Sequence, residues 1–258
     1  MYRSGDVLLR VGAGDPAPQI VLLAHLKACS LDVLTPLDLA RLQVGTWWVT
    51  AWPWLDSAAG VAIDGERLGR TVARLHQLGA PALGMTSSLP EYRSFPWLDL
   101  QNSLSTIAPS GAVTPTQLKV LIREADALAN WWIEATPYGV VTCHGDVHPN
   151  NVLVTASRQF LLDWDSICLG PPQLDHATLL TWETRWGGQP GLYSAFARGY
   201  GHDFSNDPVT VLLGRFRNLV ATINMVVRSI ADASVRAESQ IRLRWWTGER
   251  NAPQWTPQ

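Results

Sequence analysis

The sequence predicts an α+β protein with a small β-containing front and a larger, mainly helical remainder. Short β-rich runs occur at residues 6–11 and 45–52, whereas residues 65–78 and 116–135 have the apolar spacing of amphipathic helices. A hairpin pattern over residues 151–162 interrupts the helical part. We therefore expect two lobes, one built on a sheet and one built from helices that hold a single hairpin.

The front of the chain contains two expected strands and one expected helix. Residues 6–11 form the first strand-like run, and helical periodicity follows over residues 19–28. Residues 45–52 are again rich in β-forming side chains, and Pro53 stops this run because proline cannot donate to a strand ladder. We assign residues 1–54 to the N-terminal lobe.

The larger part, residues 55–258, opens with the helix expected over residues 65–78. Residues 79–114 are rich in Pro, Gly and Ser, which favours an irregular connection. Thr114 followed by proline is a helix start signal, and the periodic pattern over residues 116–135 predicts one continuous helix.

Three short strands and a helical end complete the pattern. Residues 139–143 read as a buried strand, and residues 151–154 and 160–162 read as the two strands of a hairpin. Beyond Asp175 the chain is expected to be mostly helical to about Trp246.

Composition excludes several classes of protein. Hydrophobic residues make up 47% of the chain and charged residues 16%, which is too apolar and too weakly charged for disorder. No apolar run reaches the roughly 18–20 residues that span a bilayer, and the first residues lack the pattern of a signal peptide. The three cysteines have no C-x-x-C spacing, which indicates neither a disulfide framework nor a zinc ribbon. We expect a soluble, cytoplasmic protein with no membrane partner.

The net charge of −2 argues against a nucleic-acid polymer as partner, because such binding depends on many phosphate contacts. The charge is unevenly distributed. Residues 121–214 hold ten Asp and Glu against four Arg, whereas residues 215–250 hold seven Arg against three Asp and Glu. The acidic segment suits a divalent metal and a cationic substrate, although solvated surface carboxylates would give the same count.

Polar residues gather where the strand-like runs end, which is where rigid scaffolds display catalytic groups. His144 and Asp146 follow one run, Asn151 begins the next, and Asp163 follows the last. Phosphoryl transfer needs a carboxylate at the attacking hydroxyl and Mg²⁺ at the phosphate oxygens. Asp146 and Asn151 have the D-x-x-x-x-N spacing of kinase catalytic loops, and the hairpin is expected to bring Asp163 beside Asn151.

These motifs resemble the aminoglycoside phosphotransferase and choline kinase superfamily, whose members have a protein-kinase-like fold. The matching residues are His144-Gly-Asp-Val-His-Pro-Asn-Asn-Val-Leu-Val154 and Leu162-Asp-Trp-Asp165, with weaker support from residues 68–76 and 170–175. The resemblance implies a two-lobed kinase-like fold with an abbreviated β lobe. It also implies an enzyme that transfers the γ-phosphoryl group of ATP or GTP to a hydroxyl of an antibiotic or metabolite, with Mg²⁺ as cofactor.

The resemblance assigns roles to individual residues of the motif. Asp146 would be the catalytic aspartate that accepts or orients the proton of the substrate hydroxyl. Asn151 and Asp163 would bind Mg²⁺, and Asp165 would assist through a second metal or its water shell. His144 would pack beneath the loop and fix it.

Three further residues receive roles outside the centre of the motif. Asp175 would be a buried acid that ties down the catalytic segment. Arg10 falls where a kinase lysine holds the α and β phosphates. Gln19 stands where a kinase has the glutamate partner of that lysine, so the ion pair would become at most a hydrogen bond. His148 would either face the phosphates or only shape the loop.

The front of the chain is shorter than a kinase-like fold would predict. Such a fold normally has two earlier strands and a loop over the phosphates, whereas five residues precede Asp6. Either the natural start lies upstream of Met1 or the nucleotide lobe is cut down, in which case water exclusion around the phosphates would suffer.

Two other functional classes stay open at this point. A catalytically silent relative that binds a nucleotide or metabolite would fit the short front and the Arg10–Gln19 pair. A metal-dependent hydrolase would use the Asp and His residues as a dinuclear site. The acceptor itself has no readable code, although the thirteen tryptophans favour an apolar or sugar ring.

Overall fold

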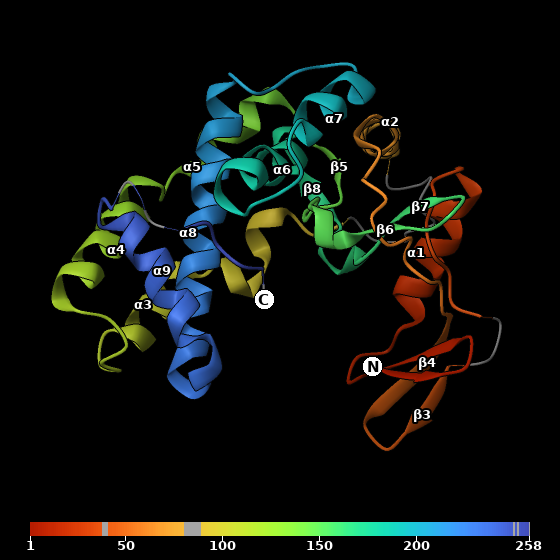
Figure 1. Cartoon of the computed structure of the whole chain (residues 1–258), viewed down its shortest axis with the longest axis horizontal. Helices are drawn as coiled ribbons and strands as arrows, with labels where there is room; N and C mark the ends of the chain where they lie inside the picture. Colours follow the sequence, from red (N-terminus) through yellow and green to blue (C-terminus); the bar gives the residue numbers. More distant parts are fainter. Residues whose placement is uncertain (38–40, 80–88, 250, 252, 258) are drawn as a thin grey trace.

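The computed structural model describes residues 1–37, 41–79, 89–249, 251 and 253–257, and it consists of a small sheet lobe and a larger helical lobe (Figure 1). The sheet lobe contains β1 Tyr2–Ser4, β2 Val7–Gly12, α1 Ala17–Ala28, β3 Leu42–Val44 and β4 Trp47–Pro53. Its strands pair in the order β1-β2-β4-β3, all antiparallel.

The helical lobe surrounds two small two-stranded sheets. Its helices are α2 Gly65–His76, α3 Leu100–Ile107, α4 Pro115–Ala127, α5 Trp131–Ala135, α6 Gln173–Arg185, α7 Leu192–Tyr200, α8 Pro208–Ala231 and α9 Arg236–Trp246. Its strands are β5 Val141–Cys143, β6 Val152–Val154, β7 Gln159–Leu161 and β8 Cys168–Gly170. Short 3-10 turns lie at η2 Tyr92–Ser94, η3 Pro96–Leu98, η4 Thr136–Tyr138, η5 Pro149–Asn151, η6 Trp164–Ser166 and η7 Ala233–Val235.

In the sheet lobe, the strands expected over residues 6–11 and 45–52 and the helix expected over residues 19–28 are confirmed within two residues at each end, as β2, β4 and α1. Strands β1 and β3 were not predicted. Strand β3 forms a hairpin with β4, with Val44 opposite Trp47. Gly45 adopts a φ of +61° in the two-residue turn, a conformation that costs glycine little. The pairing of β2 with β4 aligns Arg10 with Thr50 on one face of the sheet.

The continuous helix expected over residues 116–135 is wrong in extent. It begins as expected, because Thr114 and Gln117 form a reciprocal capping box. Helix α4 nevertheless ends at Ala127, and α5 restarts the chain at Trp131. The restart turns the Trp131 ring onto Phe216 of α8, where the stacked centroids lie 4.4 Å apart. Tertiary packing therefore overrides the local helical pattern.

The irregular connection expected over residues 79–114 contains a helix, α3, and residues 80–88 lie outside the described residues. Asp99 caps α3 by accepting a hydrogen bond from the amide of Asn102. Leu100, Leu104 and Ile107 are spaced on one helical face and are all buried. This short apolar stripe was obscured by the Pro, Gly and Ser residues around it.

The described residues form two hydrophobic cores. One surrounds α8 and includes α3, α4 and α5. The other joins α1, α2 and α7 to the β6–β7 hairpin. Helices α2 and α7 approach closely because a Cβ on Gly69 or Gly199 would lie within 2.1 Å of backbone oxygen in the facing helix. Among the described residues, no helix has the length and apolarity needed to cross a bilayer, and the cytoplasmic location stays a prediction.

Candidate active site

Two antiparallel strand pairs bring the motif residues to one place. Strand β5 pairs with β8, and β6 pairs with β7. The backbone amide of Leu162 donates to the carbonyl of Asn151 at 2.7 Å, one residue beyond the β6–β7 ladder. Asp163 follows immediately, so the hairpin places it next to Asn151 although the two are twelve positions apart in the sequence.

A buried carboxylate anchors the loop that precedes Asp146. Asp175, fully buried in the first turn of α6, accepts hydrogen bonds from the backbone amides of His144 and Gly145, each at 2.8 Å. Its second contact is with Nε2 of His76, at 3.0 Å. Burial alone would raise the pKa of Asp175, but the contact with His76 and the amide of His144 outweigh it and hold the pKa below its usual value.

The His144 ring joins the loop at Asp146 to the end of the β6–β7 hairpin. Its Nε2 lies 2.9 Å from the carbonyl oxygen of Leu162, and the amide of Asp146 lies 3.3 Å from its Nδ1. Because a carbonyl can only accept, Nε2 carries the proton and Nδ1 accepts. Burial lowers the pKa of His144, which keeps the ring neutral. This arrangement orients the backbone at Asp146 and leaves no free nitrogen on the ring for chemistry.

The loops pass each other so closely that one position requires glycine. Gly145 has a φ of +81°, and a Cβ there would lie 2.3 Å from the carbonyl oxygen of Ser166. Asp163 also has a positive φ, +60°, which is uncommon for a residue with a side chain. Such conformations persist where surrounding contacts determine them, and they cluster at functional sites.

Asp146 lies in a network of charged and polar groups. Its Oδ1 accepts from the Arg217 guanidinium of α8, which also donates to the hydroxyl of Tyr92. Its Oδ2 lies 3.3 Å from Nε2 of His148. Its backbone carbonyl accepts a hydrogen bond from the side-chain Nδ2 of Asn151 at 2.9 Å. Burial would raise the pKa of Asp146, but the positive charge of Arg217 and the contact with His148 hold it well below the usual range.

Asp163 and Asn151 offer oxygen atoms of the kind that Mg²⁺ prefers. Burial, followed by the charges of Asp165 and Asp146, raises the pKa of Asp163. A carboxylate that is crowded by other negative charges gains stability when a cation binds it. The side-chain nitrogen of Asn151 is used by the Asp146 carbonyl, so its side-chain oxygen is the atom it could offer to a metal. The donor set therefore fits the ion.

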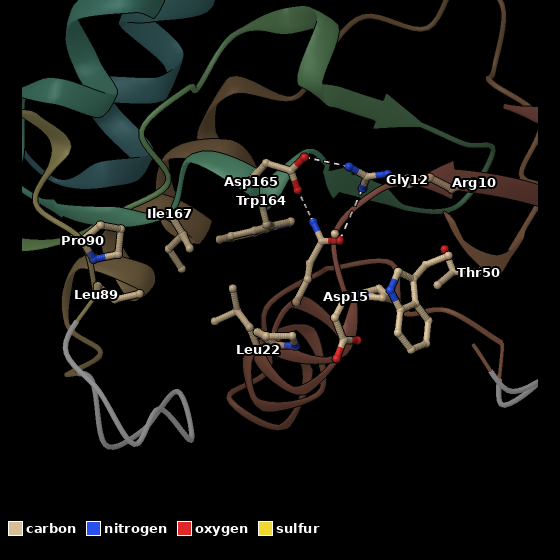
Figure 2. Close-up of a pocket in the computed structure, with 15 residues that line it drawn as sticks. Arg10, Gly12, Asp15, Leu22, Thr50, Leu89, Pro90, Trp164, Asp165 and Ile167 are labelled. Carbon is tan, nitrogen blue, oxygen red and sulfur yellow. Dashed lines mark hydrogen bonds and ion pairs between the residues drawn. The ribbon is translucent and has the colours of Figure 1, made fainter. Parts of the chain in front are cut away.

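Arg10 bridges the two lobes (Figure 2). It lies 2.7 Å from Asp165 and donates to the side-chain oxygen of Gln19 at 3.4 Å, so the hydrogen bond expected with Gln19 is present. Gln19 in turn donates to the other oxygen of Asp165. The structure thus pairs Asp165 with the sheet lobe, and its role as a metal ligand stays a prediction.

The bridge separates two cavities beneath the sheet. One, of about 150 Å³, is lined by apolar residues including Leu8, Trp52 and Leu162, together with Asp163. The other, of about 460 Å³, extends along the far end of the same sheet face and is lined by residues that Figure 2 draws, including Trp48 and Ile167. Arg10, Gln19 and Trp164 line both cavities.

Two further cavities meet at Asp146. One, of about 390 Å³, contains the three carboxylates Asp146, Asp163 and Asp165. The other, of about 420 Å³, extends into the helical lobe and contains His148. Asp146 and Arg217 line both, so the carboxylate lies between an acidic cavity and a cavity within the helices.

The structure therefore gathers Asp146, His148, Asn151 and Asp163 at one site, with His144 and Asp175 behind the loop and Arg10 across the cleft. Sequence reasoning missed Arg217 and Tyr92, which contact each other and, through Arg217, Asp146. The only sequence signal for Arg217 was its position in the basic segment 215–250, and that signal does not identify a contact.

Comparison with known proteins gives one family match and many structural likenesses. The model of the phosphotransferase enzyme family matches residues 12–211. No curated protein sequence matches the chain significantly.

Among solved structures, the chain is similar to spectinomycin phosphotransferase APH(9)-Ia in complex with ADP and spectinomycin, with a TM-score of 0.67, 18% identity, and coverage of 96% of this chain and 82% of that one. It is also similar to a choline/ethanolamine kinase family protein from Mesorhizobium loti, with a TM-score of 0.66, 19% identity, and coverage of 97% and 84%. A third likeness is to the GDP and kanamycin complex of APH(2")-IIia, with a TM-score of 0.68, 14% identity, and coverage of 95% and 88%. At these identities the likeness establishes the two-lobed α+β fold.

Proposed function

The chain belongs to the phosphotransferase enzyme family, and from this membership we propose that it transfers the γ-phosphoryl group of ATP or GTP to a hydroxyl group of a small molecule. The observation that carries the proposal is the position of Asp146. It lies between a cavity rich in carboxylates and a cavity within the helical lobe, with Asn151 and Asp163 beside it. Structures similar to this one were solved with ADP and with GDP, which supports a nucleotide as donor.

We assign the nucleotide to the cleft beneath the sheet lobe, residues 1–54, and the acceptor to the helical lobe, residues 55–258. The 150 Å³ cavity offers apolar walls for a base, and Asp163 lies at its edge. Phosphates directed from there toward Asp163 would pass Arg10, whose guanidinium can bind phosphate oxygens. His148 would contribute by holding the Asp146 carboxylate, which its Nε2 approaches to 3.3 Å.

Asn151 and Asp163 would hold Mg²⁺, with Asp165 as a further oxygen donor. The bound ion would neutralise charge on the phosphate oxygens of the donor. The chain's own residues supply the positioning. Asp146 orients the acceptor hydroxyl and takes its proton as the oxygen attacks the γ-phosphorus, while the bond from that phosphorus to the bridging oxygen breaks and the nucleoside diphosphate leaves.

Catalysis of this kind depends mainly on fixed geometry. The Asp175 carboxylate fixes two backbone amides of the loop, and His144 fixes its other side. These contacts would hold Asp146 still while the acceptor binds. Asp175 and His144 therefore act as positioning residues in this proposal.

The test is an ADP-release or GDP-release screen across hydroxyl-bearing metabolites and antibiotics, with ATP and GTP as donors. With an acceptor found in this way, Asp146→Asn should retain the fold and nucleotide binding but lower turnover by about a hundredfold or more. Asp126→Asn, an exposed change on α4, is the matched control and should turn over normally.

Normal turnover by Asp146→Asn would refute the role of Asp146. Nucleotide binding in calorimetry without product release from any acceptor would instead favour a catalytically silent relative.

A further inference from the structure

The cavity that enters the helical lobe beside Asp146 is lined by more positive than negative side chains. Its volume is about 420 Å³. The charged residues in its lining are Asp146, Arg217, Arg228 and Arg242, and His148 adds a titratable ring. Asp146 is thus the one carboxylate that the described residues contribute to this lining. All three arginines come from α8 and α9, within the basic segment of residues 215–250.

Two of these arginines are occupied by contacts within the protein. Arg242 is almost fully buried and donates to Glu238 at 2.8 Å and to the carbonyls of Ala221 and Thr256. Arg217 is paired with Asp146. The pair between Arg217 and Asp146 matters for a ligand, because an ammonium group entering the cavity would find Asp146, the one carboxylate among the described lining residues, already bound to a guanidinium.

Arg228 differs from the other two arginines in its freedom to bind a ligand. Its side chain is 52% exposed, and its ion pair with Asp232 is long, at 3.7 Å. An exposed pair of this length contributes little, so the guanidinium can exchange it for another anion at small cost. A guanidinium also binds carboxylate or phosphate through two parallel hydrogen bonds.

The remaining walls suit a ring-bearing molecule with polar substituents. The rings of His148, Trp182 and Trp186 form a continuous stack, with centroid distances of 4.8 and 5.2 Å and interplanar angles of 9° and 10°. Asn218 and Thr181 add neutral polar groups to the lining. The charged and aromatic walls are therefore distinct parts of one cavity.

We infer that the acceptor carries an anionic group, a carboxylate or a phosphate, which binds Arg228 while its hydroxyl lies at Asp146. This inference rests on the proposed phosphotransferase function and specifies its substrate class. It reverses the expectation of a cationic substrate drawn from the acidic segment. The acids of that segment at the site, Asp146, Asp163 and Asp165, line the cavity on the transfer side. The arginines line the cavity on the acceptor side.

The experiment uses probes of similar size in which one group at a fixed position is negative, neutral or positive. One set is 4-(hydroxymethyl)benzoate, 4-(hydroxymethyl)benzamide and 4-(hydroxymethyl)benzylamine, and the other is glucuronate, glucose and 6-amino-6-deoxyglucose. Binding to the whole protein is measured by calorimetry at low ionic strength, with and without a non-hydrolysable analogue of ATP or GTP, and release of ADP or GDP is measured in parallel. We expect each carboxylate to bind at least about tenfold more tightly than the matching amine, as one charge-assisted contact allows.

Substitutions on α8 test whether Arg228 binds the anionic group. Arg228→Gln should weaken carboxylate binding by about tenfold and leave amine binding unchanged, and Arg228→Lys should restore part of the loss. Arg215→Gln is the matched control, because Arg215 lies on the same helix, has a side chain of the same 52% exposure, and is not among the lining residues. It should bind all probes like the natural protein.

Equal or tighter binding of the amines would overturn the inference, as would an unchanged carboxylate affinity in Arg228→Gln. The lack of carboxylate binding up to about 10 mM would do the same. The proposed function fails separately. If the carboxylates bind preferentially but no acceptor, in this set or in the screen, yields ADP from ATP or GDP from GTP, the phosphotransferase reaction is refuted and the anion site stands. If release of ADP or GDP favours the amines, the reaction stands and the anionic acceptor is refuted.

Discussion

The ion pair of Arg217 and Asp146 should stabilise the folded protein, and a double-mutant cycle can measure the coupling free energy between the two side chains. The perturbations are Asp146→Asn, Arg217→Gln and the two together. Both side chains are largely protected from solvent, with 26% of Asp146 and 16% of Arg217 exposed. Removing one partner leaves the other charge poorly solvated, which is the costly way to break such a pair.

The magnitude follows from the distance and the burial. Two unit charges about 4 Å apart attract by about 4 kcal/mol at the effective dielectric constant of about 20 that suits such sites. Residual exposure weakens this attraction, so we expect a coupling free energy of about 2 kcal/mol. Each single substitution should cost a similar amount, and the double substitution should cost less than the sum of the two.

The assay is urea unfolding, followed by far-ultraviolet circular dichroism at neutral pH. The pair of Arg198 and Glu66 on the surface, with side chains 64% and 45% exposed, provides a control cycle that should show almost no coupling. The contribution of Asp146 is present above pH 3.8, the usual pKa of an aspartate, and is lost as the pH falls below it, because Arg217 lowers the pKa in the folded state. A coupling below about 0.5 kcal/mol would refute the reasoning, since pairs without contact reach that value.

Two further predictions concern the framework behind the site. Gly145→Ala should lower the free energy of unfolding in urea by at least about 1 kcal/mol more than Gly111→Ala does. Both glycines have a positive φ, but only at position 145 would a Cβ meet backbone, 2.3 Å from the carbonyl oxygen of Ser166. Equal losses of stability in the two variants would contradict the clash. Burial lowers the pKa of His176 from 6.5 to about 3, so the folded state binds this proton less readily than the unfolded chain, and stability should fall as the pH drops below 6.5. Between pH 7.5 and pH 5, protonation linked to His176 should lower the free energy of unfolding by about 2 kcal/mol, and His176→Phe should remove this loss. An unchanged pH dependence of stability in that variant would show that other groups cause the loss.

Patterns that are local in the sequence predicted the fold well. Strand β2 and the β6–β7 hairpin were recognisable because a few consecutive residues decide a strand and a turn. The capping box at Thr114 likewise lies within four residues. The break after Ala127 was not predictable in this way, because it depends on Trp131 meeting Phe216 of a helix much later in the chain.

The same limit applies to the candidate site. The loop motif predicted that Asp146, Asn151 and Asp163 would lie together, since one hairpin joins them. The partner of Asp146 is 71 positions away, on a face of α8 that only tertiary packing selects. A count of charges gave the sign of the segment that contains Arg217 and Arg228. It indicated a metal and a cationic substrate, or only solvated carboxylates, for the acidic segment and left the basic one without a role.

Arginine at position 10 and glutamine at position 19 both depart from the kinase pattern. In the structure they contact each other, and both contact Asp165. The guanidinium of Arg10 has separate nitrogens for Gln19 and Asp165, which a lysine ammonium could not present in the same fixed fork. Gln19 accepts from Arg10 with its oxygen and donates to Asp165 with its nitrogen. A glutamate at position 19 has no donor, so it would set a second carboxylate against Asp165 and raise the energy of both. The amide at position 19 therefore gives the Asp165 carboxylate a donor beside α1 instead of a second carboxylate, and arginine at position 10 and glutamine at position 19 act together in holding Asp165.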